Sequence, residues 1–220
     1  MLRRSPERYV GAAGILFVVL YVLPTVIWGG VRPDDAATKV ASDLMSHRGL
    51  ATASAYLLLA GSIALLVFAA GVTRDAEGRA ASPILSRTAF AAGAVSVALL
   101  AAANAVLAAL GGYLVAGSSA ETIRALNGLW DALTTVSGLF MGVFVVAASL
   151  LAFETRTLAR WLRWLGLVGG AVLIVGAGSV ATPFHGVGPF WVLGVAATMV
   201  WIAATGVWLL VRRPIGGTRG

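Results

Sequence analysis

The feature that most constrains this chain is a series of six long apolar segments. They cover roughly residues 10–28, 50–72, 88–116, 119–153, 165–182 and 189–211. An α-helix needs about 20 apolar residues to cross the hydrocarbon core of a bilayer, and the segments are close to or beyond that length. Only short loops remain between them. The sequence therefore predicts an all-α fold, a six-transmembrane-helix bundle that forms a single domain over residues 1–220.

The composition argues against a soluble fold. Hydrophobic residues make up 59% of the chain and charged residues 11%, whereas a soluble domain has about 25% charged residues. This surplus of apolar side chains cannot be buried inside a domain of this size, so most of it must face lipid. The chain has no cysteine, which rules out disulfides, cysteine-ligated zinc and iron–sulfur clusters.

The basic residues divide unequally between the two sides that alternate loops would occupy. Positive residues remain on the cytoplasmic side of a membrane, so we expect both termini to be cytoplasmic. The asymmetry also explains the net charge of +7, and we expect no nucleic-acid partner. One side has 12 of the 16 Lys and Arg residues, namely Arg3, Arg4, Arg8, Arg74, Arg79, Arg87, Arg156, Arg160, Arg163, Arg212, Arg213 and Arg219.

The fourth loop, ETRTLARWLRW, alternates arginine with leucine and tryptophan. This pattern predicts a segment at the inner interface whose arginines, Arg156, Arg160 and Arg163, contact anionic lipid headgroups. The preference for arginine over lysine, with abundant Ala, Gly and Val, is typical of GC-rich bacterial coding. The predicted location is therefore the bacterial cytoplasmic (inner) membrane.

The longest external piece, residues 34–48, reads DDAATKVASDLMSHR. Its apolar residues share one helical face, which predicts a short amphipathic helix at the outer surface. Asp34 or Asp35 suits its N-cap, and Gly49 suits its C-terminal stop. The alternative is that this piece only extends the second transmembrane helix outward. The residues of the apolar face are Ala37, Val40, Ala41, Leu44 and Met45.

The segment 119–153 carries a polar stripe at helical spacing, which marks the face that meets other helices. Asp131 is the only acidic residue inside the apolar run of this segment, residues 126–153, so it is the default candidate for a functional residue. Ser118 and Glu121 form an S-x-x-E capping box that would begin this helix. In an antiparallel hairpin centred there, Asn104 lies level with Asp131, and the two could share a hydrogen bond. The candidate outer polar pocket comprises Asp131, Asn104, Asn127, Arg124, Thr135 and His185.

Two small-xxx-small patterns predict close approach between helix backbones. They are Gly138-x-x-x-Gly142 and Gly166-x-x-x-Gly170. We interpret them as internal packing contacts, and formation of a homodimer is the alternative.

No residue set in the chain predicts a cofactor or a bound metal. Asp43, His47, Asp131 and His185 would lie toward the outer side, but their spacing matches no metal-site signature. No lysine lies in a span, which excludes a retinal Schiff base. No P-loop is present either.

The whole-chain pattern resembles a family of bacterial, actinobacterial-type multi-pass membrane proteins of unknown function. The resembling stretches are VASDLMSHRGL, ALNGLWDALTTVSGLFMGVFVVAASL, RWLRWLGLVGG and the final WLLVRRP. The resemblance implies a six-helix inner-membrane bundle with an unassigned role, and it transfers no catalytic residue.

These observations favour a non-enzymatic membrane protein that binds lipid, a small molecule or a protein partner around the outer polar pocket. One alternative is a small proton-coupled transporter in which Asp131 carries the proton. Another is a metal-dependent membrane hydrolase that uses the external histidines and acids.

Overall fold

The computed structural model describes residues 6–28, 35–77, 82–178 and 188–211. Within these ranges the chain is helical and contains no strand. Six helices are long and apolar enough to cross a membrane, in agreement with the six segments predicted. They are α1 (Pro6–Trp28), α3 (Arg48–Glu77), α4 (Pro83–Ala109), α6 (Ala120–Thr155), α7 (Arg160–Ala177) and α8 (Gly188–Val211).

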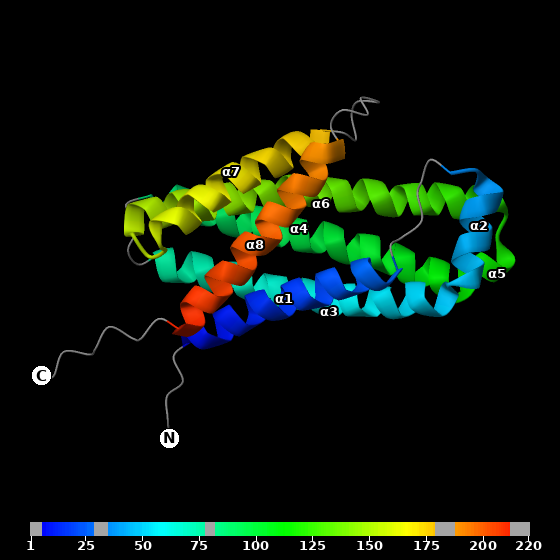
Figure 1. Cartoon of the computed structure of the whole chain (residues 1–220), viewed down its shortest axis with the longest axis horizontal. Coiled ribbons are helices and arrows are strands. Elements are labelled where there is room, and N and C mark those ends of the chain that lie inside the picture. Colours follow the sequence, from blue (N-terminus) through cyan, green and yellow to red (C-terminus); the bar gives the residue numbers. More distant parts are fainter. Residues whose placement is uncertain (1–5, 29–34, 78–81, 179–187, 212–220) are drawn as a thin grey trace, which may run out of the picture.

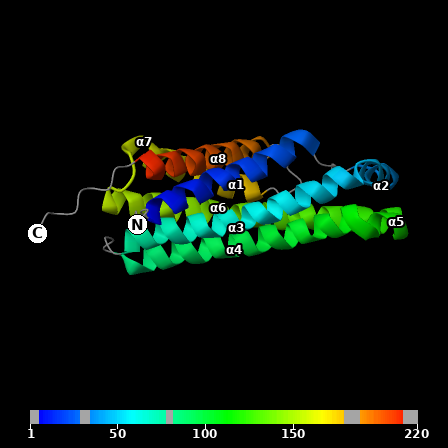
Figure 2. The same cartoon turned by 90° about the horizontal axis from the view of Figure 1, so that it is seen from below.

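The six long helices form a closed ring in chain order. Each packs against the next, and α8 returns to pack against α1. Figure 2 shows α1 and α8 on one side of the bundle and α3 and α4 on the other. The helix α6 is the most deeply buried of the six, in agreement with the polar stripe that predicted contacts with other helices.

One end of the bundle collects the basic residues, and we call it the basic end. Here α1 begins, α8 ends and α6 passes into α7 (Figure 1). The described basic residues at this end are Arg8, Arg74, Arg87, Arg156, Arg160 and Arg163. The other end, the α2 end, is built from the longer helices α3, α4 and α6 together with the short helix α2 (Ala37–Ser46) (Figure 1).

The interior near the basic end is filled by three large aromatic side chains. Phe68 of α3, Phe144 of α6 and Trp201 of α8 are fully buried. Their rings meet edge to face, with centroids 6.2–6.5 Å apart, the arrangement that aromatic quadrupoles favour. We call these three residues the aromatic plug. They close the space inside the ring of helices toward the basic end.

The helix α2 docks on the bundle through part of the apolar face that the sequence indicated, whereas Met45, predicted on that face, is 53% exposed. Val40 and Leu44 are fully buried and pack with Ala51 and Ala55 of α3 and Ile123 of α6. The chain turns at His47, and α3 begins at Arg48. This helix is therefore a separate element, and it is not a continuation of α3.

The predicted ends of α2 are wrong. Its N-cap is Ala36, which has no side-chain cap, and Asp35, one residue earlier, forms an ion pair with Lys39 at 2.8 Å. Gly49 does not end the helix, since it lies in the first turn of α3. Asp34 lies outside the described residues.

The predicted start of α6 is wrong by one residue. The N-cap is Ser119, whose hydroxyl accepts a hydrogen bond from the Thr122 backbone N–H at 3.3 Å. Ser118 instead ends the preceding turn, where its N–H donates to the Leu114 carbonyl at 3.0 Å. Either of the two adjacent serines could have been the N-cap by sequence, and in the structure the second one is.

The segment predicted at 88–116 is not one regular helix. After α4 the chain forms a π-helix, η1 (Leu110–Leu114), and a last short turn, α5 (Val115–Gly117). Gly111 allows close contact here, since a Cβ on it would lie 2.7 Å from Thr52 Oγ1 and 2.9 Å from the Thr52 backbone nitrogen. Arg48 donates a hydrogen bond to the Gly112 carbonyl at 2.9 Å. The helix α3 therefore lies close to the chain at the wider π-helical turn η1.

The helix α7 begins at Arg160 rather than near residue 165. The arginine- and tryptophan-rich segment predicted as an interfacial loop is therefore partly the first turn of this helix. Arg163 lies over the Phe153 ring at 5.0 Å, a cation–π contact that fixes its stem against α6.

Candidate functional site

A cavity lies inside the ring of helices, between the aromatic plug and the α2 end, and we call it the central cavity. It has an empty volume of about 340 Å³, part of which belongs to its open mouth. Because this figure includes open space at the mouth, the enclosed part is much smaller than a typical small-molecule site of about 300–1,000 Å³. Five helices line it, with Phe17, Tyr21, Leu100, Thr134, Ser137, Gly138, Met141, Leu173, Trp191, Val195, Thr198 and Met199.

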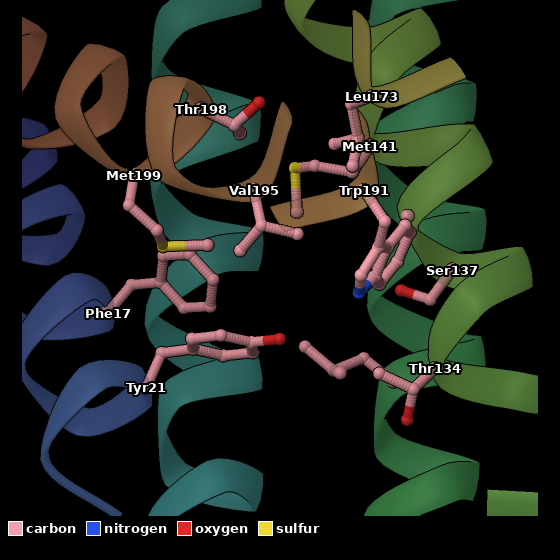
Figure 3. A pocket seen from close by; sticks show the side chains of 12 residues that line it. Phe17, Tyr21, Thr134, Ser137, Met141, Leu173, Trp191, Val195, Thr198 and Met199 are labelled. Atoms are coloured by element: carbon pink, nitrogen blue, oxygen red, sulfur yellow. The ribbon is translucent and has the colours of Figure 1, made fainter. Parts of the chain in front are cut away.

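The cavity exists because α1 and α8 meet at one end and separate toward the other (Figure 1). They touch near the basic end, where a Cβ on Gly11 would lie 2.5 Å from the Gly206 carbonyl oxygen. Further along, the larger Phe17 and Tyr21 of α1 lie beside Val195 and Met199 of α8 in the cavity lining (Figure 3). Glycines at the crossing and large side chains beyond it thus set the angle between the two helices.

Trp191 forms the wall opposite α1, and three glycines position it. A Cβ on Gly138 of α6 would collide with its six-membered ring. A Cβ on Gly176 of α7 would lie 2.5 Å from the Trp191 backbone nitrogen, and one on Gly194 would lie 2.5 Å from Leu173 Cα. The start of α8 is therefore held close to α6 and α7, and this presents the indole to the cavity.

The lining is apolar with a few polar atoms. Figure 3 shows the Tyr21 hydroxyl and the Trp191 ring nitrogen pointing into the space from its two sides. Thr198 is fully buried, and its hydroxyl has no hydrogen-bond partner among the described residues. The Thr134 hydroxyl is satisfied, because it donates to the Trp130 carbonyl at 2.8 Å. No charged side chain is among the lining residues.

Ser137 joins the cavity wall to α4. Its hydroxyl donates to the Ser96 carbonyl at 2.8 Å, and Ser96 donates to the Ser137 carbonyl at 3.0 Å. Both residues are buried. This reciprocal pair fixes the register of the antiparallel hairpin of α4 and α6, since sliding either helix would leave two hydroxyls in an apolar interior.

The structure does not gather the predicted polar residues around the central cavity. Asn104, Asn127 and Thr135 are buried, whereas Arg124 and Asp131 are exposed, and none of the five lines the cavity. The expected hydrogen bond between Asn104 and Asp131 is not made. A carboxylate could accept only from the Asn104 side-chain nitrogen, and that buried atom has no partner among the described residues. His185 lies outside the described residues.

The four predicted packing glycines all lie in contacts inside the chain. Gly142 and Gly170 face each other, and a Cβ on either would lie 2.8 Å from the carbonyl oxygen of the other. A Cβ on Gly166 would collide with the Ser149 hydroxyl and the Trp201 indole nitrogen, and one on Gly138 would collide with Trp191. These contacts place α7 directly against α6.

The residues that line the cavity were not predicted from the sequence. Tyr21 and Trp191 could not be recognised as cavity residues, because aromatic residues near helix ends are also typical of interfacial belts. A weak signal was present in α8, where Thr198 and Thr205 lie one heptad apart on an otherwise apolar helix, and both are fully buried. Among the described residues, no group of three or more His, Asp or Glu side chains comes together as a metal site.

Comparisons with known proteins give a family and no assigned function. A search of curated proteins and a search of solved structures found no match to this chain. A family model described as "Domain of unknown function (DUF4386)" matches residues 10–212. With its six apolar helices, the chain is a multi-pass integral membrane protein, and it belongs to the DUF4386 family.

Proposed function

We propose that this protein is a non-enzymatic membrane protein that binds a lipid or another apolar small molecule in the central cavity. The observation that supports the proposal is a cavity walled by apolar and aromatic side chains from five helices. It lies between two helices, α1 and α8, that diverge from their crossing point.

The proposed orientation places the basic end in the cytoplasm of a bacterium. The positive-inside rule supports this, because six of the nine basic residues in the described ranges lie at that end. Arg156, Arg160 and Arg163 would then meet anionic headgroups of the inner leaflet. The central cavity would open in the outer half of the bilayer.

The helix lengths support the same placement. With a rise of about 1.5 Å per residue, the 36 residues of α6 span about 54 Å and the 18 residues of α7 about 27 Å. The hydrocarbon core is about 30 Å thick, so the α2 end of α6 projects beyond it. Arg124 and Asp131 would lie in the headgroup region or in water, which accounts for their exposure.

This geometry favours binding over proton-coupled transport by Asp131. A coupling carboxylate should be partly buried and next to the site that it controls. Asp131 is exposed and does not line the central cavity. The aromatic plug also fills the path from the cavity to the basic end.

The test is native mass spectrometry of protein gently extracted from its own membrane. We expect the wild type to carry one bound lipid or small molecule. Val195→Phe should lose this ligand, because the phenyl ring would occupy part of the cavity. The control is Val192→Phe, the same change at a side chain of α8 that is 65% exposed, and it should keep the ligand. Bare wild-type protein, or a ligand retained in Val195→Phe, would contradict the proposal.

A further inference from the structure

The central cavity offers hydrogen-bond donors without matching protein acceptors. Tyr21 approaches from α1 and Trp191 from α8, and their polar atoms point into the same space (Figure 3). No hydrogen bond joins either side-chain polar atom to another described residue. An indole N–H can only donate, and a phenol hydroxyl donates readily. Two donors on opposite walls therefore face one small apolar volume.

A third polar atom belongs to the same cavity. Thr198 is fully buried, and its hydroxyl lacks a partner among the described residues. A buried threonine in a helix usually bonds to a carbonyl one turn earlier, as Thr134 and Thr135 do in α6. Leaving a buried polar group unsatisfied is costly, so such a group indicates a ligand or an ordered water molecule.

The lining contributes few acceptors that could meet these donors. Ser137 is engaged with Ser96 through both its hydroxyl and its carbonyl. No acidic side chain is among the lining residues to accept from a donor, and no basic one is present to attract an anion. The polar part of a matching ligand must therefore be uncharged and must accept hydrogen bonds.

We propose that the ligand is a neutral lipid with a carbonyl oxygen, held by the Tyr21 hydroxyl and the Trp191 indole N–H while its apolar body lies against Met141 and Met199. This inference rests on the proposed function. A carbonyl oxygen has two lone pairs and can accept from both donors at once. The flexible methionine side chains can adapt to an apolar body of irregular shape.

Two kinds of membrane molecule share this chemistry. A quinone presents a ring carbonyl at the head of an apolar chain, and an acyl ester presents a carbonyl at the end of one. The cavity recognises the carbonyl in either case. Their different shapes allow an experiment to separate them.

The experiment compares three probes with purified protein in detergent, with binding measured by ligand-induced thermal shift and native mass spectrometry. The probes are a decyl-substituted benzoquinone, the methyl ester of a saturated fatty acid, and decylbenzene, which has no oxygen. Of the two carbonyl probes, we consider the one that binds the wild type more tightly. We expect Tyr21→Phe to lower its affinity about fivefold to tenfold, as loss of one hydrogen bond predicts. Its affinity for decylbenzene should be unchanged. The carbonyl probe that binds more tightly indicates whether the ligand is a quinone or an acyl ester.

Two further variants control the experiment. Tyr56→Phe makes the same change at a tyrosine of α3 that is 65% exposed, and it should bind all probes like the wild type. Thr198→Val keeps the side-chain shape and removes the third polar atom, so it tests the same site if Tyr21→Phe does not fold. Its expected effect is again a loss confined to the carbonyl probes.

The outcomes separate this inference from the proposed function. If decylbenzene binds as tightly as both carbonyl probes, and neither Tyr21→Phe nor Thr198→Val changes this, the donors serve water and the inference is wrong. The cavity would still be a site for apolar molecules. If no probe binds to the wild type, the proposed function and the inference both fail.

Discussion

Gly142 shows how much of this bundle depends on the absence of a single methyl group. Its backbone meets that of Gly170, so a Cβ at this position would lie 2.8 Å from the Gly170 carbonyl oxygen and 2.7 Å from Ile174 Cγ1. We expect Gly142→Ala to lower the free energy of unfolding by about 1–3 kcal/mol, the usual cost of overpacking. Thermal unfolding in detergent measures the effect.

Gly128 is the matched control, because it lies on the same helix and a Cβ there would meet nothing within 4 Å. Gly128→Ala should raise stability by about 0.5–1 kcal/mol, since alanine loses less backbone entropy in a helix. Equal effects of the two substitutions would mean that α6 and α7 are not in close contact. The spacing of Gly142 and Gly170 was visible in the sequence, but their partners were not.

At the scale of one element, the start of α6 gives the next prediction. Ser119→Ala removes the hydroxyl that accepts from the Thr122 N–H, and loss of an N-cap costs about 1 kcal/mol. Ser118→Ala should change stability by less than about 0.5 kcal/mol. Hydrogen exchange at the first turn of α6 would report the difference. Faster exchange in Ser118→Ala alone would show that the first serine is the cap.

The elements differ in how well the sequence predicts them, for physical reasons. The long helices could be predicted because the length and apolarity of a span are local properties. The docked face of α2 was also visible, since Val40 and Leu44 repeat at helical spacing between polar residues. Its ends were not, because the helix begins at Ala37 with Ala36 as an N-cap that makes no side-chain bond. The π-helix η1 lies in contact with Thr52 and Arg48 of another helix, and such a contact between distant segments cannot be read from the local sequence.

The cavity could not be predicted because α8 is apolar on every side. In such a helix no periodicity distinguishes a face toward lipid from a face toward protein. Only Thr198 and Thr205, both fully buried, mark its inner face. The polar stripe of α6 drew attention to Asp131 instead, and that residue is exposed in the structure.

At the scale of the whole molecule, the proposed orientation can be tested directly because the chain has no native cysteine. Ser46→Cys at the end of α2 and Glu154→Cys near the end of α6 place single thiols at exposed positions on opposite ends. In intact cells a membrane-impermeant maleimide should label Ser46→Cys and spare Glu154→Cys. Permeabilised cells should label both, which controls for reactivity. The reverse pattern in intact cells would invert the topology.

The crossing of α1 and α8 also determines when the site is completed during biosynthesis. A chain is made from its N-terminus, so α1 is synthesised first. Its partner α8 follows only after the long helices α3, α4, α6 and α7. Before α8 arrives, Phe68 and Phe144 lack Trp201, and the cavity has only one of its two diverging walls. The nascent bundle therefore remains open along one side through most of translation. If the central cavity binds a ligand as proposed, a chain that ends before residue 188 would lack the wall that α8 contributes to the site.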